Sequence, residues 1–109
     1  MDFSEYAPVL DLRRLELDGS VVLAVRGDLD LDTVPELRDG ITQCLAHRPT
    51  VIIVDLHDVG FMDSAGLGTL LECHRRASSV GVRLRVASAS PLILRVLRMT
   101  GTAATLGVE

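Results

Sequence analysis

The chain has 109 residues, a formal net charge of −4, 48% hydrophobic residues and 3% aromatic residues. Its basic residues are all arginines, the net charge does not support a basic groove, and the few aromatic residues offer few platforms for stacking bases, so we expect no nucleic-acid partner. No segment approaches the ~20 apolar residues of a membrane span, and Met1–Glu5 lacks the basic and apolar parts of a secretory signal. We expect a cytoplasmic protein with a single domain, residues 1–109, that does not enter a membrane.

The chain opens with a predicted β-hairpin. Residues 9–17 and 21–25 are β-prone runs on either side of Asp18-Gly19, a dipeptide that readily adopts the positive φ angles of a tight turn. The segment Gly27-Asp28-Leu29-Asp30 is expected to end the second strand, because turn-forming residues there follow the apolar run.

A helix is predicted to follow at once and to end before Pro49. Thr33 and Glu36 match a capping box, and Pro35 is tolerated in the first turn, where its missing N–H costs nothing. The apolar residues recur at helical spacing and predict one stripe that packs against a sheet: Val34, Leu37, Ile41, Cys44 and Leu45.

The run Val51-Ile52-Ile53-Val54 predicts a central strand that is covered on both faces or deeply buried, with Asp55 at its carboxyl end. A second helix is predicted to begin at the turn around Ser64 and to stop at Gly81. Its expected inner arc comprises Leu67, Leu70, Leu71, His74 and Ala77.

The last third of the chain predicts one strand and one helix. Residues 82–86 alternate between apolar residues and arginines, as in a strand with one solvent-exposed face. Ser90-Pro91 opens a short helix through Met99, and residues 101–107 carry only a weak strand signal. The order of elements implies an α/β layer structure with crossover helices.

The most informative motif is Phe61-Met62-Asp63-Ser64-Ala65-Gly66-Leu67-Gly68. It places Ser64 where a buried strand ends and an amphipathic helix begins. Unpaired backbone N–H groups in the first helical turn, together with the helix dipole, favour negative charge at that end. A phosphate on Ser64 would be held there without unfolding the domain, so the motif indicates a switch rather than a catalytic centre.

The residues of this motif also have purely structural interpretations. Ser64 would serve as a plain N-cap that accepts the Leu67 N–H. Asp63 either caps the helix itself or orients the serine hydroxyl in a kinase active site. Gly66 and Gly68 either let a partner or its nucleotide approach the backbone or allow close packing of strand on helix.

Three segments carry a resemblance to a known family. Gly27-Asp28-Leu29-Asp30, Val54-Asp55-Leu56 and the block from Phe61 to Gly68 resemble the STAS domain of bacterial anti-sigma factor antagonists, with a likeness over roughly residues 9–100. The resemblance implies a mixed β-sheet with helices packed mainly on one side. It also implies that an anti-sigma factor serine kinase phosphorylates Ser64. We expect no metal ion or cofactor in this chain, since ATP and Mg²⁺ belong to the kinase.

The function implied is that of an anti-sigma factor antagonist. The unphosphorylated form binds the kinase and frees the sigma factor, phosphorylation of Ser64 ends the binding, and a protein phosphatase resets the switch. The expected partner surface comprises Asp28, Asp30, Asp63, Ser64, Ala65, Gly66, Leu67 and Gly68.

Several alternatives stay open at this level. Asp28 and Asp30 either belong to the partner surface or cap the next helix. Many relatives carry a second hydroxyl where this chain has Ala65, so Ser64 is the sole acceptor in the motif. The alternative function is a STAS subunit of a transporter complex or of a signalling scaffold, and a homodimer is possible.

An enzymatic interpretation would use Ser64 as a nucleophile with His57 or His74 as its base. The spacing does not support it, because position 62 is methionine and the Gly-x-Ser-x-Gly motif is absent. A P-loop is absent as well, so the sequence predicts no enzyme.

Cys44 and Cys73 are too few and too far apart for a metal motif or a disulfide framework. They are interpreted as buried structural thiols, with a redox-sensitive pair as the alternative.

Overall fold

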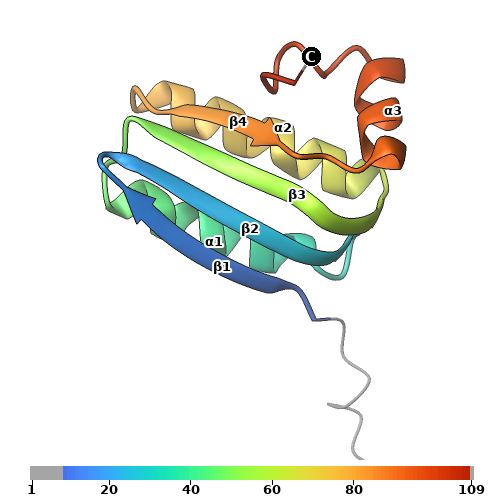
Figure 1. Ribbon diagram of the computed structural model, residues 1–109, viewed down its shortest axis with the longest axis horizontal. Coiled ribbons are helices and arrows are strands. Elements are labelled where there is room, and N and C mark those ends of the chain that lie inside the picture. The colour runs from blue at the N-terminus through green and yellow to red at the C-terminus, as the bar shows by residue number, and fades with distance from the viewer. Residues whose placement is uncertain (1–8, 109) are drawn as a thin grey trace, which may run out of the picture.

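The computed structural model describes residues 9–108, so the segment Met1–Glu5, in which we predict no secretory signal, lies outside the described residues. The described part forms a four-stranded mixed sheet in the order β1-β2-β3-β4, with β1 antiparallel to β2 and the remaining pairs parallel (Figure 1). The elements in chain order are β1 (Asp11–Leu17), β2 (Ser20–Leu29), α1 (Val34–Ala46), β3 (Val51–Met62), α2 (Ser64–Ser79), β4 (Arg83–Ala87) and α3 (Pro91–Met99).

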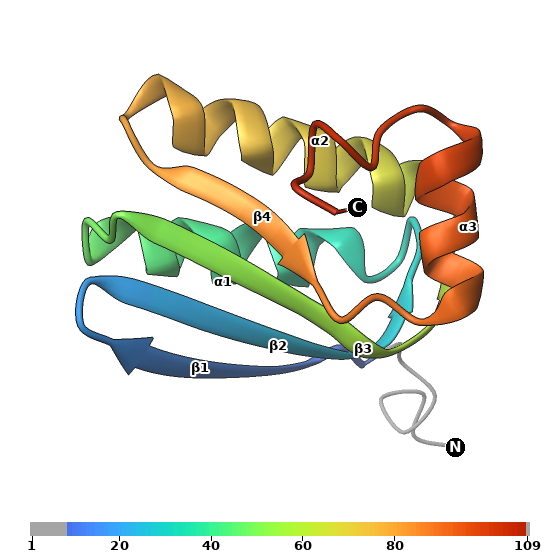
Figure 2. The same cartoon turned by 45° about the horizontal axis from the view of Figure 1, so that its top comes forward.

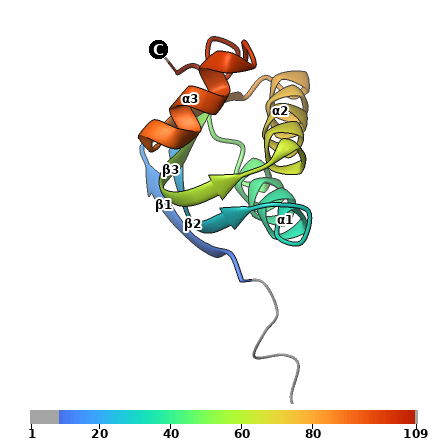
Figure 3. The same ribbon diagram turned by 90° about the vertical axis from the view of Figure 1, so that its right-hand side faces the viewer.

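The helices α1 and α2 cover one face of the sheet, as predicted for the family (Figure 3). The crossovers β2–α1–β3 and β3–α2–β4 step in the same direction across the sheet, so right-handed connections place both helices on the same face. Figure 2 shows the strands in front of these two helices, with the opposite sheet face toward the viewer. Among the described residues, no helix has the length and apolar character needed to cross a membrane.

The predicted burial of the central strand holds fully for one face and in part for the other, and α3 contacts β3 as well as α2 does. Ile52 and Val54 are fully buried against the helices, whereas Val51 and Ile53 on the other face are half-buried. The continuous β-branched run hides this alternation, because both faces are apolar although the second is only half-buried.

The strand β2 ends at Leu29, within the segment predicted to end it, whereas β3 extends beyond its predicted end at Asp55. Parallel pairing continues to Leu29↔Met62, with irregular register around Gly27, whose φ is +126°. The predicted end at Asp55 is where β4 stops pairing, while β2 remains hydrogen-bonded to β3 on its other side. The exposed polar residues His57 and Asp58 made this extension resemble a loop.

The predicted capping box of α1 is wrong. The Thr33 hydroxyl donates to the Asp28 carbonyl at 2.6 Å and accepts from the Asp30 N–H at 3.1 Å. The Glu36 carboxylate accepts from the Leu10 N–H at 2.7 Å, so it fixes the chain entering β1 onto α1. Thr33 thus bonds to the turn before the helix and Glu36 bonds to a distant segment, and the capping-box spacing reveals neither partner.

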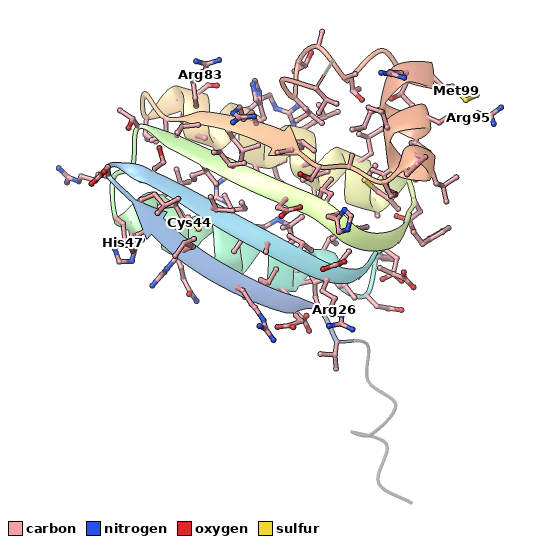
Figure 4. All side chains as sticks on the ribbon, viewed as in Figure 1. Arg26, Cys44, His47, Arg83, Arg95 and Met99 are labelled. Atoms are coloured by element: carbon pink, nitrogen blue, oxygen red, sulfur yellow. The ribbon has the colours of Figure 1, made fainter. Side chains whose placement is uncertain are left out.

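The tail forms turns rather than a strand. Leu106 is fully buried, and its carbonyl accepts from the Val86 N–H at 2.7 Å, which satisfies part of the free edge of β4. The preceding helix α3 buries Ile93 and Leu97, whereas Arg95 and Met99 project away from the sheet (Figure 4). The C-terminal segment therefore protects one edge of the sheet.

The buried face of α2 is turned relative to the predicted arc. Leu70 and Ala77 are buried as predicted, but Leu67, Leu71 and His74 are only half-buried. The buried residues of α2 are Gly66, Thr69, Leu70, Cys73 and Ala77. Small residues line this face because α2 packs closely onto the sheet.

Cys44 and Cys73 are both fully buried free thiols, which confirms the structural interpretation. Burial raises the pKa of each thiol above its ordinary value.

We expect a thiol reagent to leave both cysteines unmodified in the folded protein near neutral pH and to modify both after denaturation. The raised pKa values favour the neutral thiol in the folded state, so their stabilising contribution should fall as the pH rises through the folded pKa values. Rapid modification of native protein would contradict this expectation.

Candidate functional site

The strand-to-helix junction is built around Asp63. Its carboxylate accepts from the Gly66 N–H at 3.0 Å, and its carbonyl accepts from the Leu67 N–H at 3.0 Å. Its own N–H donates to the Leu29 carbonyl at 3.1 Å, which anchors the turn to the end of β2. Asp63 is therefore the N-cap of α2, and the interpretation of Ser64 as the cap is wrong.

Ser64 is the first residue of α2 and is exposed. Because Asp63 caps the N-terminus of α2, the Ser64 hydroxyl is not needed as a cap. Backbone N–H groups of a first helical turn and the positive end of the helix dipole face an anion attached at this position. The adjacent carboxylate of Asp63 adds negative charge, so a phosphate there would meet both attraction and repulsion.

The two glycines of the motif have different environments. A Cβ on Gly66 would lie 2.5 Å from the Leu29 carbonyl oxygen and 2.8 Å from Cγ of Met62. A Cβ on Gly68 would meet nothing within 4 Å. Gly66 is thus required by strand-to-helix packing, whereas Gly68 leaves the exposed backbone of α2 open to close approach.

The loop after β2 lies beside this junction because β2 and β3 end together. Asp28 pairs with Phe61, and Leu29 pairs with Met62. Asp28 is exposed, and a Cβ added to Gly60 would lie 3.7 Å from its carboxylate oxygen.

Asp30 has a structural role in the same loop. Its carboxylate accepts from the Asp32 N–H at 3.0 Å and from the Thr33 N–H at 3.2 Å. These bonds tighten the turn that leads into α1, which supports the interpretation of Asp30 as a turn carboxylate.

The predicted partner residues therefore divide by exposure. Asp28, Ser64 and Gly68 are exposed, and Asp30, Asp63, Ala65 and Leu67 are half-buried. Gly66 is buried, so it supports this surface through packing and offers no contact area itself.

Sequence reasoning missed two apolar side chains near the junction. Leu31 is 75% exposed in the loop after β2, and Phe61 is 49% exposed near the end of β3. Large exposed apolar residues beside a small polar centre are typical of protein interfaces. The signal available in the sequence was that the motif begins with an aromatic residue in a chain with few aromatic residues.

Neither His57 nor His74 is placed to activate Ser64. His74 belongs to α2 itself, and at about 1.5 Å of rise per residue it lies about 15 Å along the helix from Ser64. His57 lies on β3, and its spacing from Met62 alone amounts to about 16 Å along an extended strand. The geometry therefore offers no nucleophile–base pair at Ser64.

The mixed sheet with two helices on one face agrees with the resemblance to STAS domains. The family profile described as "Mlab, STAS domain" matches residues 12–107, and the chain belongs to this family. An anti-sigma-B factor antagonist from Staphylococcus aureus is 30% identical over 84% of this chain and 85% of its own length. Within the STAS family, the chain thus falls among the anti-sigma factor antagonists.

Two further similarities agree with this placement. The anti-sigma-F factor antagonist RsfB from Mycobacterium tuberculosis is 38% identical over 49% of this chain, and the matched stretch spans only 43% of RsfB. The Bacillus cell fate determinant SpoIIAA in its phosphorylated form superposes with a TM-score of 0.66 and 27% identity, over 88% of this chain and 86% of its own.

Proposed function

We propose that this chain is a phosphorylation-controlled antagonist of an anti-sigma factor kinase in the cytoplasm. The unphosphorylated form binds the kinase and releases the sigma factor, phosphorylation of Ser64 ends the binding, and a phosphatase restores it. The observation that carries the proposal is the exposure of Ser64 at the first position of α2, with the capping role already taken by Asp63.

The similarity to a phosphorylated relative supports this proposal. SpoIIAA was solved in a phosphorylated form, and its fold matches that of this chain. Phosphorylation is thus compatible with this architecture.

The electrostatics of the junction explain how a phosphate would act. A phosphate adds about −1.5 to −2 charges next to Asp63, and the exposed Asp28 lies on the neighbouring strand, paired with Phe61. A partner that fits the small, neutral hydroxyl and also contacts the exposed Leu31 and Phe61 would then face a bulky dianion. Repulsion between like charges and the desolvation of the phosphate at an interface cost several kcal/mol. One covalent event is therefore sufficient to reverse partner choice.

The first test is the phosphorylation state of the protein in its native host. Peptide masses before and after phosphatase treatment should show one removable phosphate on the peptide that contains Ser64. The Ser64→Ala variant should carry none. The absence of phosphate under all growth and stress conditions, with complete coverage of the motif, would contradict the proposal.

A pull-down of the native partner tests the alternative function. Capture of a permease or transporter ATPase subunit in place of a nucleotide-binding kinase would favour the transporter alternative.

A further inference from the structure

The strand β1 forms one edge of the sheet, and its outer side faces none of the other described strands (Figure 1). At the opposite edge, the C-terminal segment covers part of β4, because the Val86 N–H donates to the Leu106 carbonyl. The two-residue turn Asp18-Gly19 makes Leu17 and Ser20 a hydrogen-bonded pair, and alternation then directs the backbone N–H and C=O groups of Arg14 and Glu16 away from β2. An edge of this kind is a template for another strand.

The side chains of β1 are arranged for such an addition. Leu15 is 57% exposed and Leu17 is 53% exposed, both on the sheet face that α1 and α2 leave open. On the other face, the side chains of Arg14 and Glu16 are 37% and 54% exposed and lie 3.8 Å apart. Glu16 also lies 3.4 Å from His47, which Figure 4 places at the same end of the sheet.

The sequence and packing of β1 favour one antiparallel register with a second copy of the strand. A two-fold axis perpendicular to the sheet keeps each side chain on its own face, so a residue must lie at the axis. An axis at Arg13, Arg14 or Glu16 would place like charges opposite each other. An axis at Leu12 would pair Asp11 with Arg13, but the Leu12 side chain already packs against the core of its own chain. An axis at Leu15 pairs Leu15 with Leu15 and gives two Arg14–Glu16 cross-strand pairs.

The backbone agrees with this register. With the axis at Leu15, the directly opposed Arg14 and Glu16 are the residues whose peptide groups point outward, so they form the hydrogen-bonded pairs. The leucines meet at the closer, non-hydrogen-bonded position. Because Leu15 pairs with Val22 and Val22 pairs with Ile53, the apolar row of the open face continues across the axis.

We propose that two copies of this chain associate through their β1 edges in this register and form one continuous eight-stranded sheet. The occupant of the edge is a second copy because the charge pattern of β1 complements itself. The proposal is independent of the proposed function. Ser64 follows β3, which β2 separates from the β1 edge, so the dimer leaves both serines accessible.

Charge exchange tests the pairing. The wild-type chain should show concentration-dependent dimerisation in sedimentation equilibrium. Arg14→Glu and Glu16→Arg should each raise the dimer dissociation constant about tenfold or more, because each replaces two attractive pairs by two repulsive ones. The double variant R14E/E16R should restore dimerisation, and an equimolar mixture of the single variants should form a heterodimer. Restoration separates the proposed contact from a loss of folding.

Disulfide trapping tests the register. Opposed residues at the non-hydrogen-bonded position lie about 4.5 Å apart between Cα atoms, which suits a disulfide. Leu15→Cys should therefore form a covalent dimer under mild oxidation, while the native Cys44 and Cys73 are buried. Arg13→Cys is the matched control, since the two copies of that position would lie about 14 Å apart. A wild-type chain that remains monomeric up to millimolar concentration, or equal trapping of both variants, would overturn the proposal.

Discussion

Phosphorylated protein is expected to bind the anti-sigma factor kinase about a hundredfold more weakly than unphosphorylated protein, which corresponds to ~3 kcal/mol. Ser64→Asp, with a single added charge, should weaken binding about tenfold. Ser64→Ala should bind like the unphosphorylated protein and should remain bound when ATP is added, because the acceptor hydroxyl is missing. Calorimetry or biolayer interferometry with the purified kinase, in the presence of ADP and then of ATP, measures these differences.

A matched control separates a local effect from a change in net charge. Ser78 is an exposed serine of the same helix, about 21 Å from Ser64 along its axis. Ser78→Asp introduces the same charge away from the junction and should leave kinase binding unchanged. Equal kinase binding by Ser64→Ala and Ser64→Asp would show that charge at this position does not control the partner.

Local sequence signals predicted much of the fold. Asp18 and Gly19 do adopt positive φ values, of 40° and 85°, in the hairpin turn. The helix from Ser90-Pro91 to Met99 also has its predicted bounds, and Ser90 caps it by accepting from the Ile93 N–H. Turns and helix starts depend on a few neighbouring residues, so spacing is informative for them.

Features that depend on distant segments were less predictable. The extension of β3 to Met62 arises because β2 continues beside it after β4 has ended. The Glu36 carboxylate meets the Leu10 N–H instead of its own helix, since the hairpin brings Leu10 to α1. No periodicity within either segment records these contacts.

The candidate site shows the same division. The position of Ser64 at the helix start was predicted from the motif, and Asp63 as the cap was one of two alternatives. The roles of Gly66 and Gly68 were indistinguishable in the sequence, because they depend on which face of α2 lies against Leu29 and Met62. Exposure of Leu31 and Phe61 likewise follows from how the ends of β2 and β3 meet.

The contrast between these glycines leads to a large expected effect on stability. In Gly66→Ala, the new methyl carbon would lie 2.5 Å from the Leu29 carbonyl oxygen, so α2 must move away from β2. Overpacking of this kind costs about 1–3 kcal/mol, and the backbone contact places this variant at the upper end. Gly68→Ala meets open space and should stabilise the protein by up to ~1 kcal/mol through helix propensity. Denaturant unfolding of both variants measures the difference.

The same pair of variants links packing to signalling. A shift of α2 in Gly66→Ala would disturb the bond from the Gly66 N–H to Asp63, and with it the presentation of Ser64 to the kinase. Phosphorylation by the kinase should therefore slow in Gly66→Ala even under conditions where the variant is fully folded.

If a partner closely approaches the exposed backbone at Gly68, Gly68→Ala should weaken kinase binding while raising stability. Equal stability of the two variants would contradict the packing of α2 against Leu29, because only a methyl group at position 66 meets that strand.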